Sequence, residues 1–205
     1  MPRSFQALLT WLYDWLSGAD PIRNADLIFT LAGRQSRKVF ALGLFEQGRA
    51  PRLLLSVGRF EIRRFAKLRL PANVNLLEIA TPVFPPERHF FVIFENHKVE
   101  VEWVPRRRLG TLSEIRALAT WLRGHPEVSS LLVVSSATHL RRVRMCCRSL
   151  LPPQVHTLLA GVPNEDPFLQ RDRWWRSRAA RAMVVPEPIK LLVYRLALLF
   201  QNEIS

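Results

Sequence analysis

Cysteine is scarce in this chain of 205 residues, which contains only the adjacent pair Cys146 and Cys147. Neighbouring cysteines rarely form a disulfide with each other, so a disulfide-stabilised scaffold is excluded. No spacing of cysteine and histidine matches a zinc site, and we predict no metal centre. The pair is expected to be reduced and at least partly buried in a core, which is typical of a cytoplasmic protein.

Long apolar segments are also missing, because no run reaches the roughly 18 residues needed to span a bilayer. The apolar N-terminal stretch is interrupted by Thr10 and Asp14, and it lacks a basic region beyond Arg3 and a small-residue cleavage site. We therefore predict neither a transmembrane segment nor a signal peptide. The apolar spacing from Ser4 to Leu16 predicts a helix, which either packs on the domain or lies on a membrane surface.

Lysine is rare as well: of the 30 basic residues only four are lysines, and the formal net charge is +13. Arginine binds phosphate and carboxylate groups through paired donors. The charge therefore either serves an anionic partner or reflects a genome rich in arginine codons. A nucleic-acid partner is the least favoured, because the sequence holds no nucleic-acid-binding motif and its arginines are scattered.

What the sequence does contain is a clear strand–turn–helix pattern that begins at Leu131. Four apolar residues, 131–134, predict a strand buried on both faces, as in a parallel sheet. A polar turn with Ser135, Ser136 and His139 follows at once. The next apolar residues share one face of a helix: Val143, Cys146, Cys147 and Leu150. Ligands of open α/β sheets bind at such turns, where helix N-termini favour anions.

The same pattern recurs along the chain. Short apolar strands are predicted at 27–31, 53–56, 75–80 and 155–160, and helices follow the first two. Serial units of this kind predict parallel strands with right-handed crossovers and helices on both faces of the sheet. Between 81 and 108, prolines and an alternating pattern around Asn96-His97 predict a β-hairpin insertion or an edge ribbon.

The whole chain, 1–205, is predicted to form one domain. Its parts are an N-terminal helix (1–20), a first βαβαβ half (26–80), the β-hairpin (81–108), a second half (109–161) and C-terminal helices (162–205). Thr111 and Glu114 have the spacing of a capping box at the start of a helix. Of the C-terminal helices, one contains Trp174, Trp175 and Ala180. The other begins at Pro188 and places on one side Ile189, Leu192, Leu196 and Leu199.

In a parallel sheet the turns after the strands meet at one edge, which makes that edge a candidate anion site. The residues expected around it are Gly33, Arg34, Ser56, Gly58, Thr111, Ser135, Ser136, His139 and Arg142. His139 can bind the anion, act as a general acid, or simply hydrogen-bond within its turn. Glu114 is the acidic residue best placed for base chemistry, so His139 and Glu114 are the catalytic candidates.

Five motifs occur in order along the chain. They are Asp26–Gly33 with the helix over 37–48, Ser56-Val57-Gly58, Gly110-Thr111 with Glu114, Val134–Arg142, and Glu187 with Lys190 and Tyr194. In this order they resemble the YdcF/SanA/ElyC-like family, domain of unknown function 218. The likeness covers residues 26–194. Val57 stands where the family usually carries a glycine, and the segment 81–108 is additional.

The resemblance implies a bacterial protein with a Rossmann-like three-layer α/β/α fold and a link to cell-envelope biogenesis. It suggests a nucleotide-like or S-adenosylmethionine-like ligand, although the Gly-x-Gly-x-x-Gly fingerprint is absent. We expect a cytoplasmic protein, with peripheral membrane contact as an alternative. Three functions stay open: an enzyme acting on a phosphorylated or nucleotide-like metabolite, a non-catalytic protein that binds a small anion in the same pocket, and a nucleic-acid binder.

Overall fold

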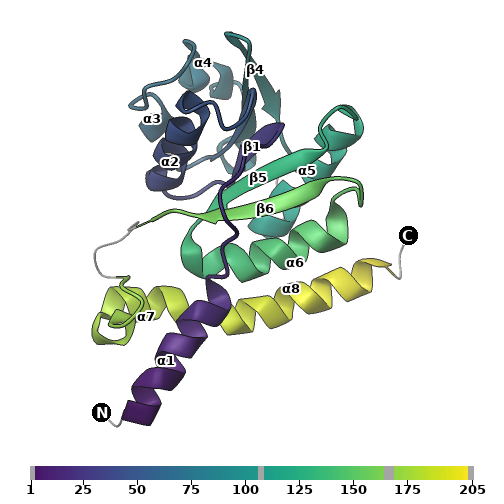
Figure 1. The fold of residues 1–205 in the computed structure, drawn as a ribbon. Coiled ribbons are helices and arrows are strands. Elements are labelled where there is room, and N and C mark those ends of the chain that lie inside the picture. Colours follow the sequence, from purple (N-terminus) through teal and green to yellow (C-terminus); the bar gives the residue numbers. More distant parts are fainter. Residues whose placement is uncertain (1–2, 106–108, 164–168, 203–205) are drawn as a thin grey trace.

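The computed structural model describes residues 3–105, 109–163 and 169–202 (Figure 1). Its strands are β1 (Leu27–Thr30), β2 (Arg52–Gly58), β3 (His89–Glu95), β4 (Lys98–Trp103), β5 (Ser130–Ser135) and β6 (His156–Gly161). Its α-helices are α1 (Arg3–Leu16), α2 (Gln35–Glu46), α3 (Ile62–Phe65), α4 (Leu76–Ala80), α5 (Gly110–Arg123), α6 (Leu140–Leu150), α7 (Arg178–Val184) and α8 (Glu187–Asn202). Single 3-10 turns lie at Pro85–Glu87, Ala137–His139 and Trp174–Arg176.

The strands form one mixed sheet in the order β4-β3-β2-β1-β5-β6. β1, β2, β5 and β6 run parallel, and Leu27 of β1 pairs with Arg52 on one side and with Leu131 on the other. β1, β2 and β5 are interior strands. Most of their residues are apolar and buried because helices cover both of their faces. The predicted α/β class, with a mainly parallel sheet, is confirmed.

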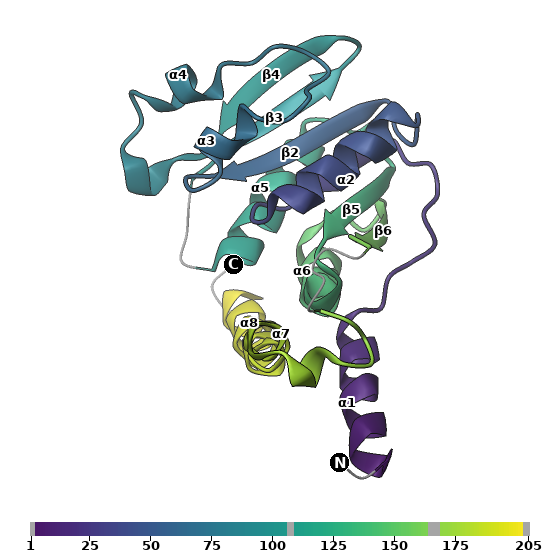
Figure 2. The same ribbon diagram turned by 90° about the vertical axis from the view of Figure 1, so that its left-hand side faces the viewer.

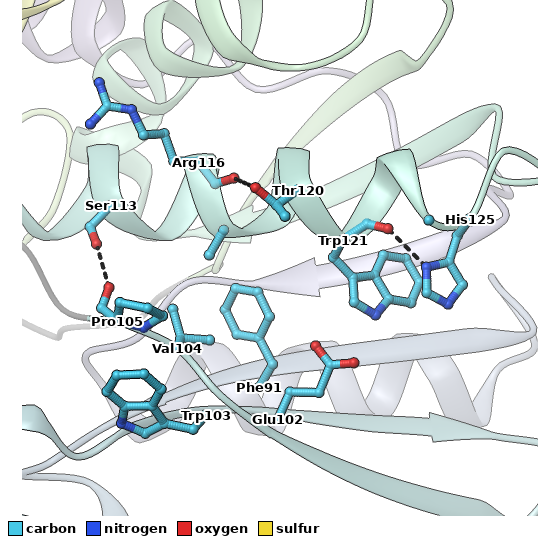
Figure 3. Close-up of a pocket in the computed structure, with 12 residues that line it drawn as sticks. Phe91, Glu102, Trp103, Val104, Pro105, Ser113, Arg116, Thr120, Trp121 and His125 are labelled. Carbon is cyan, nitrogen blue, oxygen red and sulfur yellow. Dashed lines mark hydrogen bonds between the residues drawn. The ribbon is translucent and has the colours of Figure 1, made fainter.

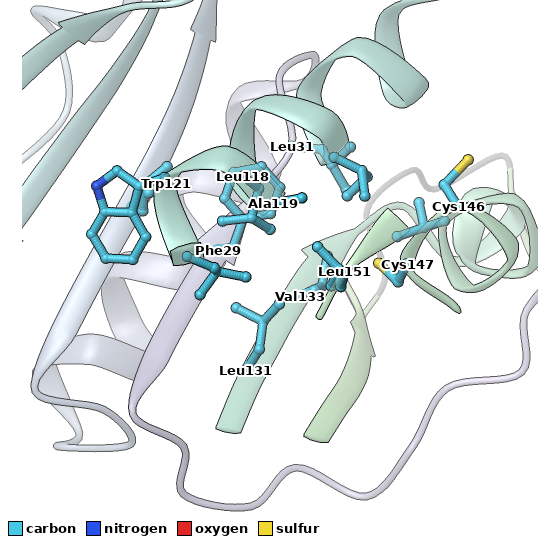
Figure 4. Close-up of a cluster of buried hydrophobic side chains, with 14 of the residues drawn as sticks. Phe29, Leu31, Leu118, Ala119, Trp121, Leu131, Val133, Cys146, Cys147 and Leu151 are labelled. Carbon is cyan, nitrogen blue, oxygen red and sulfur yellow. The ribbon is translucent and has the colours of Figure 1, made fainter. Parts of the chain in front are cut away.

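Helices cover both faces of the sheet, as Figure 2 shows, and an apolar cluster lies between the sheet and the helices on each face. Helices α2, α3 and α4 pack on one face of the sheet, and α5 and α6 pack on the other, where α8 lies against α6. Figure 4 draws side chains of the second cluster together, including Phe29 of β1, Val133 of β5, Leu118 of α5 and Cys147 of α6. The arrangement is consistent with the Rossmann-like three-layer architecture that the sequence predicts.

The hairpin predicted between 81 and 108 forms the antiparallel edge of the same sheet. β3 pairs with β2 along its whole length, from Glu95 opposite Arg52 to His89 opposite Gly58, and β4 pairs with β3. Asn96 and His97 have φ angles of 46° and 65°, which a tight two-residue hairpin turn requires. The edge-ribbon interpretation is therefore confirmed for 89–103.

The strand predicted at 75–80 is wrong, because most of this segment is helix α4. The Asn75 side chain caps the helix by accepting a hydrogen bond of 3.3 Å from the backbone N–H of Glu78. The segment also lacks the alternation of apolar and polar residues that an exposed strand needs. The place beside β2 is filled by β3 instead.

A third apolar cluster ties α1 to the C-terminal region. Leu16 is fully buried against Trp174 and Trp175, and the Trp174 Nε1–H donates to the Leu9 carbonyl at 3.1 Å. The single helix predicted around Trp174 and Ala180 is in fact a 3-10 turn followed by α7, because Ser177 caps a new helix. Among the helices described, none is long and apolar enough to cross a bilayer.

The two cysteines face the core from α6, as predicted. Both are free thiols, with 0% and 4% of Cys146 and Cys147 exposed. Burial raises the pKa of Cys146 to about 12 and raises that of Cys147 as well. Because the thiolate is the reactive form, we expect neither residue to react with a thiol reagent at pH 8 until the protein unfolds. A Ser149→Cys variant, exposed on the same helix, should react at once; equally fast labelling of the native cysteines would contradict their burial.

Candidate functional site

The carboxyl ends of the parallel strands meet at one edge of the sheet, and polar residues follow each of them. Gly33 comes after β1, Gly58 ends β2, Ser135 ends β5, and Ser136 follows it. The first turns of α2 and α5 lie at the same edge, since both helices return from it. The candidate site is therefore built from the turns that the sequence singled out, with contacts that the sequence did not reveal.

Arg37 is the residue that joins the turns after β1 and β5. Its Nε and Nη2 donate to the Ser136 hydroxyl at 2.9 and 2.7 Å, and its Nη1 donates to the Ala32 carbonyl at 2.8 Å. A Cβ at Gly33 would lie 3.0 Å from Arg37 Nη1, and Gly33 has a φ of +134°. Position 33 therefore requires glycine both for its backbone and for the guanidinium beside it.

His139 lies between this arginine and a buried carboxylate. Its Nδ1 is 2.9 Å from Arg37 Nη2, and its Nε2 is 3.4 Å from Glu187 Oε1. Because a guanidinium can only donate, Nδ1 must accept, and the ring proton is on Nε2 facing Glu187. Burial, with the positive charges of Arg37 and Arg142, lowers the pKa of His139 to about 2. His139 is therefore neutral at physiological pH.

Glu187 is fully buried and forms ion pairs with basic side chains from two helices. Its carboxylate is 3.1 Å from Arg142 Nε of α6 and 2.8 Å from Lys190 Nζ of α8. Arg142 also donates from Nη1 to the Thr111 hydroxyl at 2.5 Å. The structure thus uses Arg142 and Thr111, both predicted ligand contacts, to hold α5, α6 and α8 together.

Glu114 points inward to the strand ends instead of capping its own helix. Its Oε2 accepts from the Ala32 backbone N–H at 2.8 Å and from the Ser56 hydroxyl at 3.0 Å. The capping-box prediction is wrong, because α5 begins one residue before Thr111 and has no side-chain cap. Burial raises the pKa of Glu114, although these hydrogen bonds and nearby Arg37 and Lys38 oppose the shift.

Ser56 also lies 2.7 Å from His89 Nε2, so a serine, a histidine and an acid form one chain of contacts. The order differs from that of a hydrolase triad, because the carboxylate contacts the serine and not the second nitrogen of the histidine. Ser56 is also fully buried, which keeps its hydroxyl from a substrate. These three residues are therefore not a nucleophilic triad.

A second buried ion pair supports the turn after β2. Lys38 Nζ contacts Glu61 Oε1, while Glu61 Oε2 accepts from the Gly58 backbone N–H at 2.9 Å. Burial lowers the pKa of Lys38, and the carboxylate of Glu61 opposes that change. The pair links the first turn of α2 to the turn at Gly58. Charged side chains of α2 therefore hold both the turn after β1, through Arg37, and the turn after β2, through Lys38.

A cavity of about 260 Å³ opens beside these groups, between the β1 and β2 turns and the start of α5. Of the predicted site residues it is lined by Gly33, Gly58 and Glu114, and further lining comes from Arg59, Phe60 and Arg64. A cavity of about 570 Å³ shares Arg59 and Phe60 with it. The two cavities thus adjoin at one exposed aromatic side chain.

The other predicted residues lie outside this cavity. Ser56, Ser135 and Ser136 are buried, and His139, Thr111 and Arg142 belong to the Glu187 cluster. Arg34 is exposed, with Nη2 3.1 Å from the Met183 sulfur of α7. A different cavity, of about 460 Å³, lies between β4 and α5, and none of the predicted site residues lines it (Figure 3).

Sequence reasoning missed four buried residues of this region: Arg37, Lys38, Glu61 and His89. Arg37 and Lys38 had a detectable signal, because they occupy the first turn of a helix that begins just after a strand. Glu61 and His89 had no detectable signal in the sequence, because their partners are distant in sequence or belong to a different element. Within the described ranges, no cluster of three or more histidine, cysteine or acidic side chains could hold a metal ion.

Comparison with known proteins adds no assignment: no family model matches the chain, and no curated protein or solved structure shows significant similarity to it.

Removing the carboxylate at position 187 tests the Glu187 cluster. Glu187→Ala leaves Arg142 buried without its partner, so we expect a loss of about 3–5 kcal/mol in the free energy of unfolding. The matched control is Glu95→Ala, which removes the partly exposed partner of Arg52 and should cost under about 1 kcal/mol. Urea denaturation measures both, and equal losses would show that the Glu187 cluster adds no special stability.

The neutral state of His139 predicts a dependence of stability on pH. The unfolded histidine takes up a proton below about pH 6.5, whereas the folded one does not until about pH 2. Stability should therefore fall as the pH drops below 6.5, by up to about 1.4 kcal/mol per pH unit for this group. His139→Gln should reduce that slope, while His156→Gln, at an exposed position, should keep it. Identical slopes in the wild type and His139→Gln would refute the assignment.

Proposed function

We propose that this protein binds a small phosphate-bearing, nucleotide-like ligand in the cavity at the ends of β1 and β2. The observation that carries the proposal is the state of Arg59 and Arg64, which line the cavity. Neither side chain makes a hydrogen bond or ion pair with the described residues, and the Arg59 guanidinium lies over the Phe60 ring at 4.3 Å. Lys38 and Arg142 nearby are instead paired with carboxylates. An unpaired guanidinium at a cavity can donate two parallel hydrogen bonds to a phosphate.

Two helix N-termini support the same assignment. Helices α2 and α5 begin at this edge, and neither Arg34 nor Leu109, their N-cap residues, makes a side-chain cap. Gly110, the first residue of α5, lines the cavity. Uncapped N-termini leave backbone N–H groups and a positive dipole end available to an anion.

The size of the cavity and the aromatic side chain at its rim suggest where the phosphate and the base of such a ligand would bind. A volume of about 260 Å³ is below the roughly 300–1,000 Å³ of typical ligand pockets, so it suits a phosphate and little more. Phe60 is 75% exposed and stands where the two cavities adjoin. The Arg59 guanidinium lies over one face of this ring, so a base would stack on the other face while its phosphate enters the smaller cavity. The arginines favour this ligand over S-adenosylmethionine, which carries no phosphate.

If the protein is an enzyme, Glu114 is the candidate general acid. A buried carboxyl with a raised pKa keeps its proton more readily and can donate it to a phosphate oxygen or a leaving group. Membership of the YdcF/SanA/ElyC-like family, and with it a role in the cell envelope, belongs to the same proposal. It rests on the five ordered motifs, three of which supply Gly33, Gly58 and Glu114 to the cavity.

Calorimetric titration with inorganic phosphate and with AMP separates the two halves of the site. Arg64→Ala should weaken both ligands about ten-fold or more, because a charge-assisted hydrogen bond contributes roughly 1.5–3 kcal/mol. Phe60→Ala should weaken AMP alone, by about five-fold or more, because stacking contributes roughly 1–3 kcal/mol per base.

Two matched variants control for nonspecific effects: Arg123→Ala and Phe84→Ala, exposed residues that line neither cavity. Both should bind phosphate and AMP as the wild type does. Absence of binding to either ligand, or equal losses in the control variants, would overturn the proposal. Release of phosphate from p-nitrophenyl phosphate, abolished in Glu114→Gln, would identify an enzyme rather than a binding protein.

A further inference from the structure

Helix α8 has two apolar faces, and only one of them is covered. Tyr194 and Leu198 are buried against the sheet-covering helices. The side that the sequence marked as apolar is instead exposed, by 45–66%, at Ile189, Leu192, Leu196 and Leu199. Val193 and Phe200 extend this side, so a continuous apolar stripe runs along the helix.

Helix α1 carries a similar set of uncovered side chains. Phe5, Leu8 and Trp11 are 43%, 56% and 57% exposed, while the end of the helix is anchored by Leu16. Figures 1 and 2 show α1, α7 and α8 grouped on the side of the molecule away from the β3–β4 edge. The exposed apolar residues of α1 and α8 therefore belong to one end of the protein, distant from the cavity proposed for phosphate.

Arginines lie next to this apolar stripe. A groove of about 600 Å³ between α6 and α8 is lined by Leu192 together with Trp15, Arg141, Arg144, Arg148 and Arg195. Arg141 stacks over the Trp15 ring at 4.0 Å, and Arg144 is paired with Asp20 at 3.1 Å. Arg148 and Arg195 make no hydrogen bond or ion pair with the described residues. The groove thus offers two unpaired positive charges beside the exposed Leu192 and the half-buried Trp15.

We propose that this end of the protein, the α1–α8 face, docks on a bilayer that contains anionic phospholipids. Exposed leucine, phenylalanine and tryptophan on a helix enter the boundary between headgroups and acyl chains, while neighbouring arginines attract lipid phosphates. Tryptophan is enriched at this depth of a membrane because its ring is apolar and its N–H is polar. The helices lie on the membrane and do not cross it.

Charge decides between a membrane and a second copy of the chain. A dimer formed through this face would bring Arg148 and Arg195 of two copies together, and each copy carries a formal net charge of +13. Like charges across an interface oppose association, whereas an anionic surface neutralises them. The docking face shares no residue with the proposed phosphate cavity, so the two proposals can fail independently.

Co-sedimentation of the full-length chain with phosphatidylcholine vesicles, with and without phosphatidylglycerol, tests the proposal. We expect binding to the anionic vesicles only, and weaker binding as salt is raised. The double variant Leu192→Glu/Leu196→Glu should lower the partition coefficient at least ten-fold. Arg148→Ala and Arg195→Ala should each lower it roughly five-fold, the effect of one basic residue near an anionic surface.

The matched controls are Leu77→Glu on α4, where the leucine is 52% exposed, and Arg63→Ala on α3, both of which should bind vesicles as the wild type does. Circular dichroism confirms that each variant is folded. Absence of binding to anionic vesicles at low salt, or equal loss in the controls, overturns the proposal. A dimer in light scattering that Leu192→Glu/Leu196→Glu converts to a monomer also overturns it, because a second copy then covers the face.

Discussion

The hydrogen bonds of one buried guanidinium, that of Arg37, hold together the edge of the sheet where the parallel strands end. It donates to Ser136 after β5 and to the Ala32 carbonyl after β1, so it spans the point where the strand order reverses. In open α/β sheets a ligand usually enters the crevice at this point. Here the protein's own side chain occupies it, and the cavity proposed for a ligand opens to one side, over β1 and β2.

Several properties of neighbouring groups follow from this position. Arg37 fixes the tautomer of His139 by donating to Nδ1, and its charge helps to keep the ring neutral. It also opposes the rise in the pKa of Glu114 that burial causes. Buried charges cost desolvation energy, so such pairs do more for geometry than for stability. The Lys38–Glu61 and Arg142–Glu187 pairs extend the same principle to both sides of the crevice.

Strand and helix periodicity predicted the parallel part of the sheet well. The runs at 27–31, 53–56 and 131–134 are apolar because both faces of an interior strand are covered, and that constraint is visible in sequence. The failures were local ambiguities that only long-range contacts resolve. Residues 76–80 are apolar enough for a strand, yet β3 already pairs with β2 at that edge. Thr111 and Glu114 have capping spacing, yet each contacts a different element.

The sequence by itself determined the fold class, the buried cysteines and the turns that gather at one edge, because each depends on local periodicity and on strand direction. Only the tertiary structure decided which polar side chains form hydrogen bonds and ion pairs with one another. Arg142 was predicted to contact a ligand, but in the structure it donates a hydrogen bond to Glu187, which lies 45 positions later in the sequence. The sequence placed four apolar residues of α8 on one side, but the residues that pack are Tyr194 and Leu198. A helix with two apolar faces cannot reveal from its sequence which one meets the core.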